Sequence, residues 1–247
     1  MRARARLREY LGSLGWPNLD EQVENHLALS AGFEERFAFL DPFVPPAARD
    51  RLLVSGCAAG SEMLVARVHG FAEVVGTEVD PHLLAIAKER LPEAAGFRID
   101  LCEGPALPYP DGSFGTVVSG HVIEHSRAPL RYLAEHLRVL RPGGVLFLEF
   151  PHRYHPVELH TQTPSAEALP WPLRDLALRL RAARFRKKDP TAARAADGVR
   201  VDLRPVSLWQ VRLYLRLLRP RTARVRAVAR PAPGIVRLVV ELTAPAG

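Results

Sequence analysis

Apolar and polar positions along residues 51–150 alternate between the pattern of buried strands and that of amphipathic helices. Five short apolar runs have the length and composition of strands: 51–55, 73–78, 96–100, 115–120 and 145–150. Helical segments are predicted at 60–69, 81–90 and 128–140, the last with Leu130, Leu133, Leu137 and Leu140 on one face. Asp80 followed by Pro81 marks a helix start, because Asp caps helices and Pro fits the first turn. This alternation predicts a parallel, doubly wound α/β sheet.

The flanking sequence divides into three further parts. Residues 3–40 have helical periodicity and predict two or three helices before a proline-rich linker at 41–46. Residues 151–204 are rich in His, Pro and Arg and contain one amphipathic segment at about 171–186. A helix at 206–219 and a hairpin of strands 222–230 and 235–242 follow. The expected fold is a mostly parallel seven-stranded sheet with an antiparallel C-terminal hairpin. The predicted domains are a helical cap (1–46), an α/β core (47–150), a cap insertion (151–204) and a C-terminal completion of the core (205–247).

Length and composition limit the class of protein. A chain of 247 residues, 47% hydrophobic and 25% charged, suits one elaborated α/β domain or at most two small ones. No apolar run approaches the ~18–20 residues that span a bilayer, and no secretory signal is expected at the N-terminus. The two cysteines, Cys57 and Cys102, provide no disulfide framework and favour a reducing cytoplasm.

The net charge of +7 comes mostly from arginine. It is compatible with an anionic partner such as nucleic acid, a membrane surface or a phosphorylated substrate. An arginine-rich composition on a solvated surface explains it as well, and this second interpretation is favoured.

Candidate chemistry lies at the ends of the first two predicted strands. The first strand runs into a turn with Gly56 and Gly60, and the second ends at Glu78. The ends of neighbouring parallel strands meet at one crevice, where nucleoside ligands bind. Glycines let the backbone approach a ligand, and a carboxylate can accept hydrogen bonds from two ribose hydroxyls. An adenosine-type cofactor is therefore predicted.

Five features in this order resemble the class I S-adenosylmethionine-dependent methyltransferases, particularly the subgroup whose fourth strand ends in Val-Ile-Glu-His. They are the Gly-Cys-Ala-Ala-Gly turn, Glu78, Leu107–Phe114, Val117–His125 and Arg138–Gly144. The resemblance covers about 51–150, and the 206–242 segment fits the family's final elements. A nicotinamide dehydrogenase is the alternative, but it would need a third glycine and a helix N-terminus for the pyrophosphate.

The resemblance implies S-adenosylmethionine as cofactor, S-adenosylhomocysteine as product, and a set of binding residues. Gly56, Cys57, Ala58 and Gly60 would line the methionine and ribose. Glu78 would hold the ribose hydroxyls, Val79 would contact the adenine, and Glu103 or Asp100 would reach its edge. Gly120 and His121 would close the pocket. Val54, Ala58 and Gly115 stand where the family usually has an acid, a glycine and Phe-Asp. These departures put cofactor affinity in question and keep a non-catalytic fold-mate as an alternative.

Methyl transfer to a hydroxyl needs alignment and a base or a metal. Histidines are the natural base candidates, and five gather here: His121, His125, His152, His155 and His160. The predicted catalytic residues are Glu124, His125 and His160. Related O-methyltransferases hold a divalent cation with Glu-x-x-Glu-His, so His121, Glu124, His125 and His160 are the candidate metal ligands. The interpretation without a metal is favoured.

The acceptor is the least defined part of the prediction. An insertion after the fifth strand would overhang the cofactor, so 151–204 and the N-terminal helices are expected to set acceptor specificity. The basic segment near 171–188 could attract a phosphorylated lipid-linked sugar, a membrane surface or RNA. The expected function is O-methylation of a small molecule or glycan in the cytoplasm. RNA ribose 2′-O-methylation and cofactor binding without turnover are the alternatives, with nucleic acid not favoured.

Overall fold

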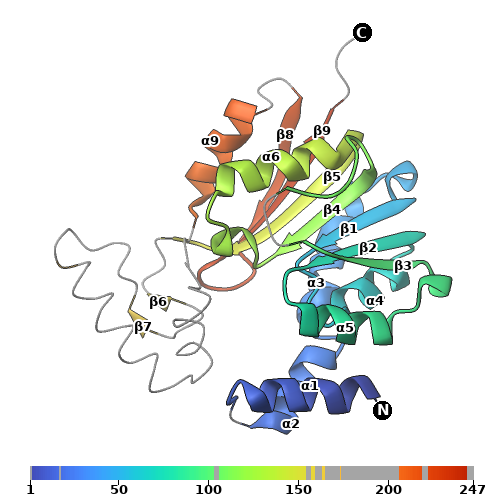
Figure 1. Ribbon diagram of the computed structural model, residues 1–247. Helices are drawn as coiled ribbons and strands as arrows, with labels where there is room; N and C mark the ends of the chain where they lie inside the picture. The colour runs from blue at the N-terminus through green and yellow to red at the C-terminus, as the bar shows by residue number, and fades with distance from the viewer. Residues whose placement is uncertain are drawn as a thin grey trace.

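The computed structural model describes residues 2–16, 18–102, 106–153, 157–158, 163–164, 173, 206–218 and 222–243. A seven-stranded sheet in the order β3-β2-β1-β4-β5-β9-β8 forms its centre (Figure 1). The parallel strands are β1 (Arg51–Ser55), β2 (Glu73–Glu78), β3 (Phe97–Leu101), β4 (Phe114–Gly120) and β5 (Leu140–Pro151). The strands β9 (Ile235–Leu242) and β8 (Ala223–Ala229) complete the sheet in antiparallel order. A separate antiparallel pair joins β6 (Val157–Glu158) to β7 (Thr163–Pro164).

Helices cover both faces of this sheet. The helices α3 (Ala31–Leu40), α4 (Ser61–Val68) and α5 (Pro81–Arg90) lie on one face, and α6 (Pro129–Val139) and α9 (Leu208–Leu218) lie on the other (Figure 1). The helices α1 (Arg2–Ser13) and α2 (Leu19–Leu27) pack together below α5. Because both faces are covered, the parallel strands are continuously apolar, and Leu52, Leu53 and Val54 are all fully buried. The doubly wound α/β fold expected from the sequence is confirmed.

Short 3₁₀ turns replace the predicted linker and punctuate the loops. They span Asp41–Phe43, Pro46–Ala48, Glu93–Ala95 and Ile123–His125. Gly115, where the family pattern has Phe-Asp, lies against one of these turns. A Cβ atom there would lie 2.6 Å from the Ala48 carbonyl oxygen, so only glycine fits beneath the crossing chain. That departure therefore has a packing reason.

Two local expectations differ from the structure. Leu130, predicted on one face with Leu133 and Leu137, is exposed in the first turn of α6, and Leu140 begins β5 and is not part of the helix. The predicted strand 145–150 begins earlier, at Leu140, so Pro142-Gly-Gly144 lies inside β5. The register between β5 and β4 shifts near Gly115. The helix predicted at 171–186 lies outside the described residues, apart from Leu173. The division into four domains stays a prediction.

No helix within the described ranges has both the length and the apolar character needed to cross a bilayer.

Candidate functional site

The loop after β1 folds back onto β2 through three residues with positive φ: Gly56 (74°), Ala58 (46°) and Gly60 (86°). The N–H groups of Gly56 and Cys57 both donate to the Thr77 carbonyl, at 2.9 Å. A Cβ on Gly56 would lie 2.5 Å from Val122, and one on Gly60 would collide with Leu91. The glycines are therefore required by the fold of the loop itself, in addition to any ligand they approach.

Glu78 joins this loop to the end of β2. Its Oε2 accepts a hydrogen bond from the Ala58 N–H at 2.7 Å, and its Oε1 accepts from Val79 and Asp80 at 2.8 and 3.0 Å. The side chain is nearly buried, with the residue 7% exposed. A carboxylate offers about four acceptor positions, so three N–H donors leave one for a ligand hydroxyl. The Ala58 bond also offsets the strain of its left-handed backbone.

The adenine side of the predicted site begins at Val79, an apolar residue that is 59% exposed directly after Glu78. Asp100, the alternative to Glu103 as an adenine contact, is already bonded. Its Oδ2 accepts from the Tyr109 hydroxyl and from Arg98 Nε, both at 2.9 Å. Glu103 lies outside the described residues.

The N-terminal helices pack beside the loop that follows β1 and the end of β2. Tyr10 of α1 donates a hydrogen bond to Asp80 and stacks on His82 with ring centroids 4.7 Å apart. The Ser61 hydroxyl donates to the His26 carbonyl at 3.0 Å. Burial and the neighbouring Asp80 raise the pKa of the Tyr10 hydroxyl, so it stays protonated as the donor. Tyr10 and His26 therefore contact the residues that flank the predicted cofactor site.

A second group of charged residues lies at the ends of β4 and β5, and we call it the charged cluster. It contains Arg36 of α3, Glu62 of α4, His121, Glu149 of β5 and Arg237 of β9. Glu149 is its centre: Arg36 Nε donates at 2.7 Å, Arg237 Nε at 2.5 Å, and His121 Nε2 lies 3.0 Å away. Arg36 Nη1 also contacts Glu62 at 3.1 Å. Buried charges are tolerated where they are paired in this way.

The pairing fixes the protonation states of the cluster. Burial opposes ionisation of Glu149, but His121, Arg36 and Arg237 outweigh it and lower its pKa to about 2. Burial likewise opposes protonation of His121, but its contact with Glu124 and its hydrogen bond with Glu149 raise its pKa to about 9. His121 is therefore an imidazolium at neutral pH, a form that cannot act as a general base, and its role as a metal ligand stays a prediction. Burial raises the pKa of Glu62 against the effect of Arg36.

Arg36 brings this cluster to the end of β4. A Cβ on Gly120 would lie 2.7 Å from Arg36 Nη1, so glycine leaves room for the guanidinium there. A guanidinium has five N–H donors, and the contacts with Glu62 and Glu149 use three of them. No pattern in the sequence predicts that Arg36, Glu62, Glu149 and Arg237 meet. The available signal was Glu149 itself, a lone carboxylate inside the apolar run 145–150.

The predicted catalytic and metal residues are only partly brought together. Glu124 is fully buried with Oε1 3.6 Å from His121 Nδ1, whereas its neighbour His125 is exposed. His152 pairs with Val206 through its backbone, as an isolated parallel β-bridge, and His155 and His160 lie outside the described residues. Within the described part of the chain, no group of three or more His, Cys, Asp or Glu side chains is placed to hold a metal ion.

Tyr132 of α6 fixes the strands between these two halves of the site. Its hydroxyl is buried and lies 2.9 Å from the Ser55 hydroxyl and 2.8 Å from that of Ser119. Ser55 ends β1 and Ser119 lies near the end of β4, where the sheet order reverses. Doubly wound sheets bind ligands at this switch point. The fold and this edge together define an α/β protein with a nucleoside-type cofactor site.

Comparison with known proteins shows which family part of the chain resembles. Residues 53–148 match the family model described as a methyltransferase domain. This part of the chain is similar to the class I S-adenosylmethionine-dependent methyltransferases, a family whose cofactor is S-adenosylmethionine. The Glu78 carboxylate, the exposed Val79 and the Arg36 guanidinium offer partners for the ribose, adenine and carboxylate groups of that cofactor.

Curated relatives cover part of the chain. A probable S-adenosylmethionine-dependent methyltransferase of Mycolicibacterium smegmatis is 37% identical over 110 residues, 43% of this chain and 40% of that protein. The demethylmenaquinone methyltransferase of Thermus thermophilus is 40% identical over 102 residues (40% and 46%). The trans-aconitate 2-methyltransferase of an Azoarcus species is 33% identical over 159 residues (63% and 57%). The chain thus spans about half the length of these relatives.

Solved structures share the fold. An S-adenosylmethionine-dependent methyltransferase from Mesorhizobium loti aligns with a TM-score of 0.61 at 16% identity, covering 86% of this chain and 99% of that one. A putative methyltransferase in complex with the Trm112 activator from Haloferax volcanii aligns with a TM-score of 0.60 at 14% identity, covering 91% and 94%. At these identities the likeness concerns the fold alone.

Proposed function

We propose that this chain transfers the methyl group of S-adenosylmethionine to a small-molecule acceptor. The observation that carries the proposal is Glu78, whose carboxylate is held at the end of β2 by the Ala58 N–H and keeps one acceptor position. The exposed Val79 beside it supplies an apolar surface for the adenine. Three relatives whose names state an acceptor or a pathway act on trans-aconitate, demethylmenaquinone and in ubiquinone/menaquinone biosynthesis, which supports a small molecule.

In this mechanism each described residue has a binding or positioning role. Glu78 accepts from a ribose hydroxyl with its remaining acceptor position, and Val79 packs on the adenine. Arg36 directs its two remaining N–H donors to the carboxylate of the methionine part. When bound, the cofactor supplies a methyl group that is already electrophilic, so the chain has to align the acceptor and exclude water.

The acceptor atom is proposed to be a hydroxyl oxygen of a small molecule or glycan. Protonated His121 cannot accept its proton at neutral pH, so the base is assigned to His125, which is exposed, with His160 and Glu124 as the other candidates. A second candidate acceptor is an activated carbon. It is favoured by the relatives from Ralstonia and Cupriavidus named as ubiquinone/menaquinone biosynthesis C-methyltransferases.

Cofactor binding is tested first, by calorimetric titration with S-adenosylmethionine. Val79→Asp should weaken binding by roughly tenfold or more, because it places a desolvated charge against the adenine. Val68→Asp is the matched control, since Val68 is 74% exposed on α4, and it should bind like the unchanged protein. Equal affinity of both variants would overturn the cofactor placement. A chain that binds no S-adenosylmethionine would favour a partner-binding fold-mate.

Turnover is tested by release of S-adenosylhomocysteine with a panel of phenols, glycans, quinone precursors and RNA oligonucleotides. His125→Ala and His160→Ala should lower turnover of hydroxyl acceptors by roughly 100-fold or more at neutral pH. Unchanged turnover in both variants would overturn the base assignment. Transfer to RNA alone would favour ribose 2′-O-methylation.

A further inference from the structure

The helix α9 has a buried apolar face and an exposed apolar face. Val211 and Leu215 are buried against the sheet, as expected for a covering helix. Trp209, Leu213 and Leu217 follow one another at four-residue spacing along a second face, and Trp209 and Leu217 are 69% and 64% exposed. Residues at that spacing lie above one another on a helix, so these three form one apolar stripe.

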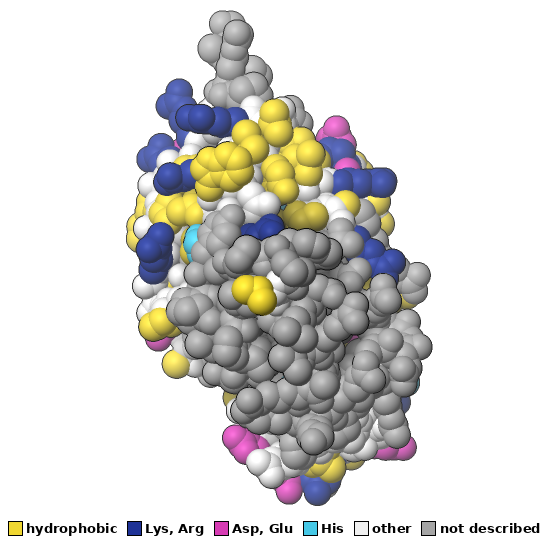
Figure 2. Space-filling model, turned by 90° about the vertical axis from the view of Figure 1, so that its left-hand side faces the viewer, with side chains coloured by type: hydrophobic (Ala, Val, Ile, Leu, Met, Phe, Trp, Pro, Cys, Tyr) yellow, Lys and Arg dark blue, Asp and Glu magenta, His cyan; other side chains and the backbone are white. Residues whose placement is uncertain are grey.

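The neighbouring edge strand β8 extends this stripe. Val225 and Val228 are each 38% exposed, and both pair with residues of β9 that face α9: Val225 with Val240 and Val228 with Leu238. Five of the eleven large apolar side chains that are exposed in the described residues therefore lie on α9 and β8. This concentration exceeds the single exposed apolar residues that are normal on a monomer. Figure 2 shows the hydrophobic side chains gathered on this face.

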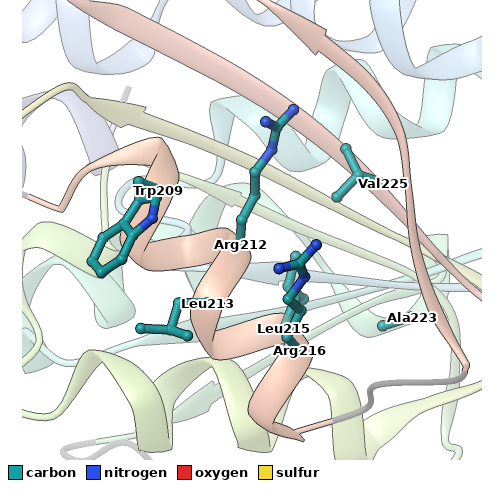
Figure 3. Close-up of a pocket in the computed structure, with 7 residues that line it drawn as sticks. All are labelled: Trp209, Arg212, Leu213, Leu215, Arg216, Ala223 and Val225. Carbon is teal, nitrogen blue, oxygen red and sulfur yellow. The ribbon is translucent and has the colours of Figure 1, made fainter.

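Arginines line the hollow between the two elements. The hollow has a volume of about 540 Å³, and Arg212 and Arg216 line it together with Trp209, Leu213, Leu215, Ala223 and Val225 (Figure 3). Neither α9 nor β8 contains an Asp or Glu. The face therefore combines exposed apolar groups with positive charge, and its own elements carry no negative charge.

We propose that α9 and β8 form a docking face, here called the α9–β8 face, for a membrane surface that contains anionic lipids. The apolar stripe would enter the boundary between headgroups and acyl chains, while Arg212 and Arg216 meet the lipid phosphates. Tryptophan suits this boundary because its ring is apolar and its N–H is polar. The proposal goes beyond methyl transfer and does not depend on it.

The charge of the α9–β8 face favours an anionic membrane over a second copy of the chain or a nucleic acid. In a two-fold dimer the same patch meets itself, so arginines of one copy would approach those of the next with no carboxylate from these elements between them. A nucleic acid would pair with the arginines but would leave Leu213, Leu217 and Val228 against a charged backbone. An anionic lipid surface satisfies both groups.

The location of the face gives it a consequence for the enzyme. Val206, two residues before α9, bridges His152 at the end of β5, which is the edge of the sheet where the cofactor site lies. Trp209 is thus at the end of α9 nearer that edge. A chain docked through this face holds the catalytic edge close to the bilayer, within reach of a lipid-dissolved acceptor.

The test is sedimentation of the full chain with vesicles of phosphatidylcholine alone and with added phosphatidylglycerol, at low and at physiological ionic strength. Binding should require phosphatidylglycerol and weaken with salt. Arg212→Gln and Arg216→Gln together should reduce it by roughly 25-fold, about fivefold for each arginine. Leu217→Ser and Trp209→Ser should each reduce it by roughly tenfold.

The controls carry equivalent changes outside the α9–β8 face. Val68→Ser on α4 and Lys88→Gln on α5 are exposed and should leave vesicle binding unchanged. All variants should keep the melting temperature and S-adenosylmethionine affinity of the unchanged chain, so that lost vesicle binding is separable from unfolding and from failure of the proposed function.

Three outcomes would overturn the proposal. The first is no sedimentation with phosphatidylglycerol vesicles, or sedimentation that the four α9 substitutions leave unchanged. The second is self-association of the chain without lipid that Leu217→Ser abolishes, which would assign the face to a second copy. The third is binding to polyglutamate as tight as to vesicles, which would assign it to an acidic protein.

Discussion

Two buried glutamates at the same edge of the sheet are stabilised in opposite ways. Glu78, at the end of β2, is held by three backbone N–H groups from its own strand end and the adjacent loop. Glu149, in β5, is held by side chains of Arg36, His121 and Arg237 that come from three other segments. One carboxylate is organised by backbone geometry and the other by charge.

The difference indicates which changes should affect each half of the site: the loop half, formed by residues 56–60 and Glu78, and the charged cluster around Glu149. Backbone N–H groups do not titrate, so the partners of Glu78 are present at every pH at which the loop is folded. The partners of Glu149 include an imidazolium, and removing any charge leaves the others buried without compensation. The loop half should therefore respond to changes in backbone conformation, and the charged cluster to charge and pH.

The sharpest way to break the comparison is Glu149→Gln. It leaves Arg36, Arg237 and protonated His121 around a neutral amide, so the free energy of unfolding should fall by about 3–5 kcal/mol in urea denaturation. Glu241→Gln, which breaks the exposed pair with Arg226 (2.8 Å), is the control and should cost about 1 kcal/mol or less. A similar small loss at both positions would show that the cluster is not a charge-dependent unit.

A second test concerns a loss of stability in acid that comes from a buried histidine outside the charged cluster. His136 of α6 is fully buried with its ring tilted against that of Tyr132, and burial lowers its pKa to about 4. Within the described residues its Nε2 has no hydrogen-bond partner. The unfolded state takes up this proton near pH 6.5, so stability should fall by about 2–3 kcal/mol as the pH decreases from 6.5 to 4.

His136→Phe should remove this acid loss, because the phenyl ring needs no proton and no partner. Urea unfolding at several pH values measures it. An acid loss that persists in His136→Phe would point to other groups. Glu149, whose pKa is lowered from 4.5 to about 2, contributes an acid loss mainly below pH 4.5, so the interval from pH 6.5 to 5 isolates His136.

At alkaline pH the cluster itself should respond. The pKa of His121 is raised to about 9 in the folded state, so its stabilisation is complete below pH 6.5 and is lost as the pH rises through 9. The side chain is 34% exposed, so the expected loss is about 1–2 kcal/mol after allowance for solvent screening. His121→Gln should be less stable at pH 6 and should not lose this increment. A parallel alkaline loss in both proteins would contradict the assignment.

The smallest effect is expected in the loop half, from Ala58→Gly. Ala58 has φ 46° and its N–H already bonds Glu78, so glycine keeps that bond and relieves the backbone strain. Because glycine also makes the unfolded chain more flexible, the net gain in stability should be at most about 1 kcal/mol, measured by thermal unfolding. A loss of stability would mean that the Ala58 methyl group has a packing role.

Local patterns in the sequence were sufficient for the sheet. Continuous apolar runs bounded by Gly, Pro and Asp placed β1 and β2 at the residues observed, and Asp80 caps α5 through the His82 and Leu83 N–H groups as its type predicts. Glu78 was identifiable because a carboxylate that ends an apolar strand stands out from its neighbours. The position of a strand end in a parallel sheet then determines which side chains meet.

The charged cluster could not be predicted in the same way. Arg36 and Glu149 are 113 residues apart, and Glu149 and Arg237 are 88 apart, so no local period connects them. The protonation of His121 depends on those partners, so no local sequence pattern reveals it. The apolar stripe on α9 could not be predicted for a different reason: helical periodicity predicts a helix at 206–219 but does not show which of its apolar side chains stay exposed.

Asp80 links the start of the chain to the ligand site. Its side chain caps α5 and accepts a hydrogen bond from the Tyr10 hydroxyl, and its backbone N–H donates a hydrogen bond to Glu78. Anything that steadies Glu78 should therefore slow the opening of α1. Cleavage of the first 27 residues by a protease would then act as a gauge of occupancy, slowing as S-adenosylmethionine is added and showing no such response once Tyr10 is replaced by Phe.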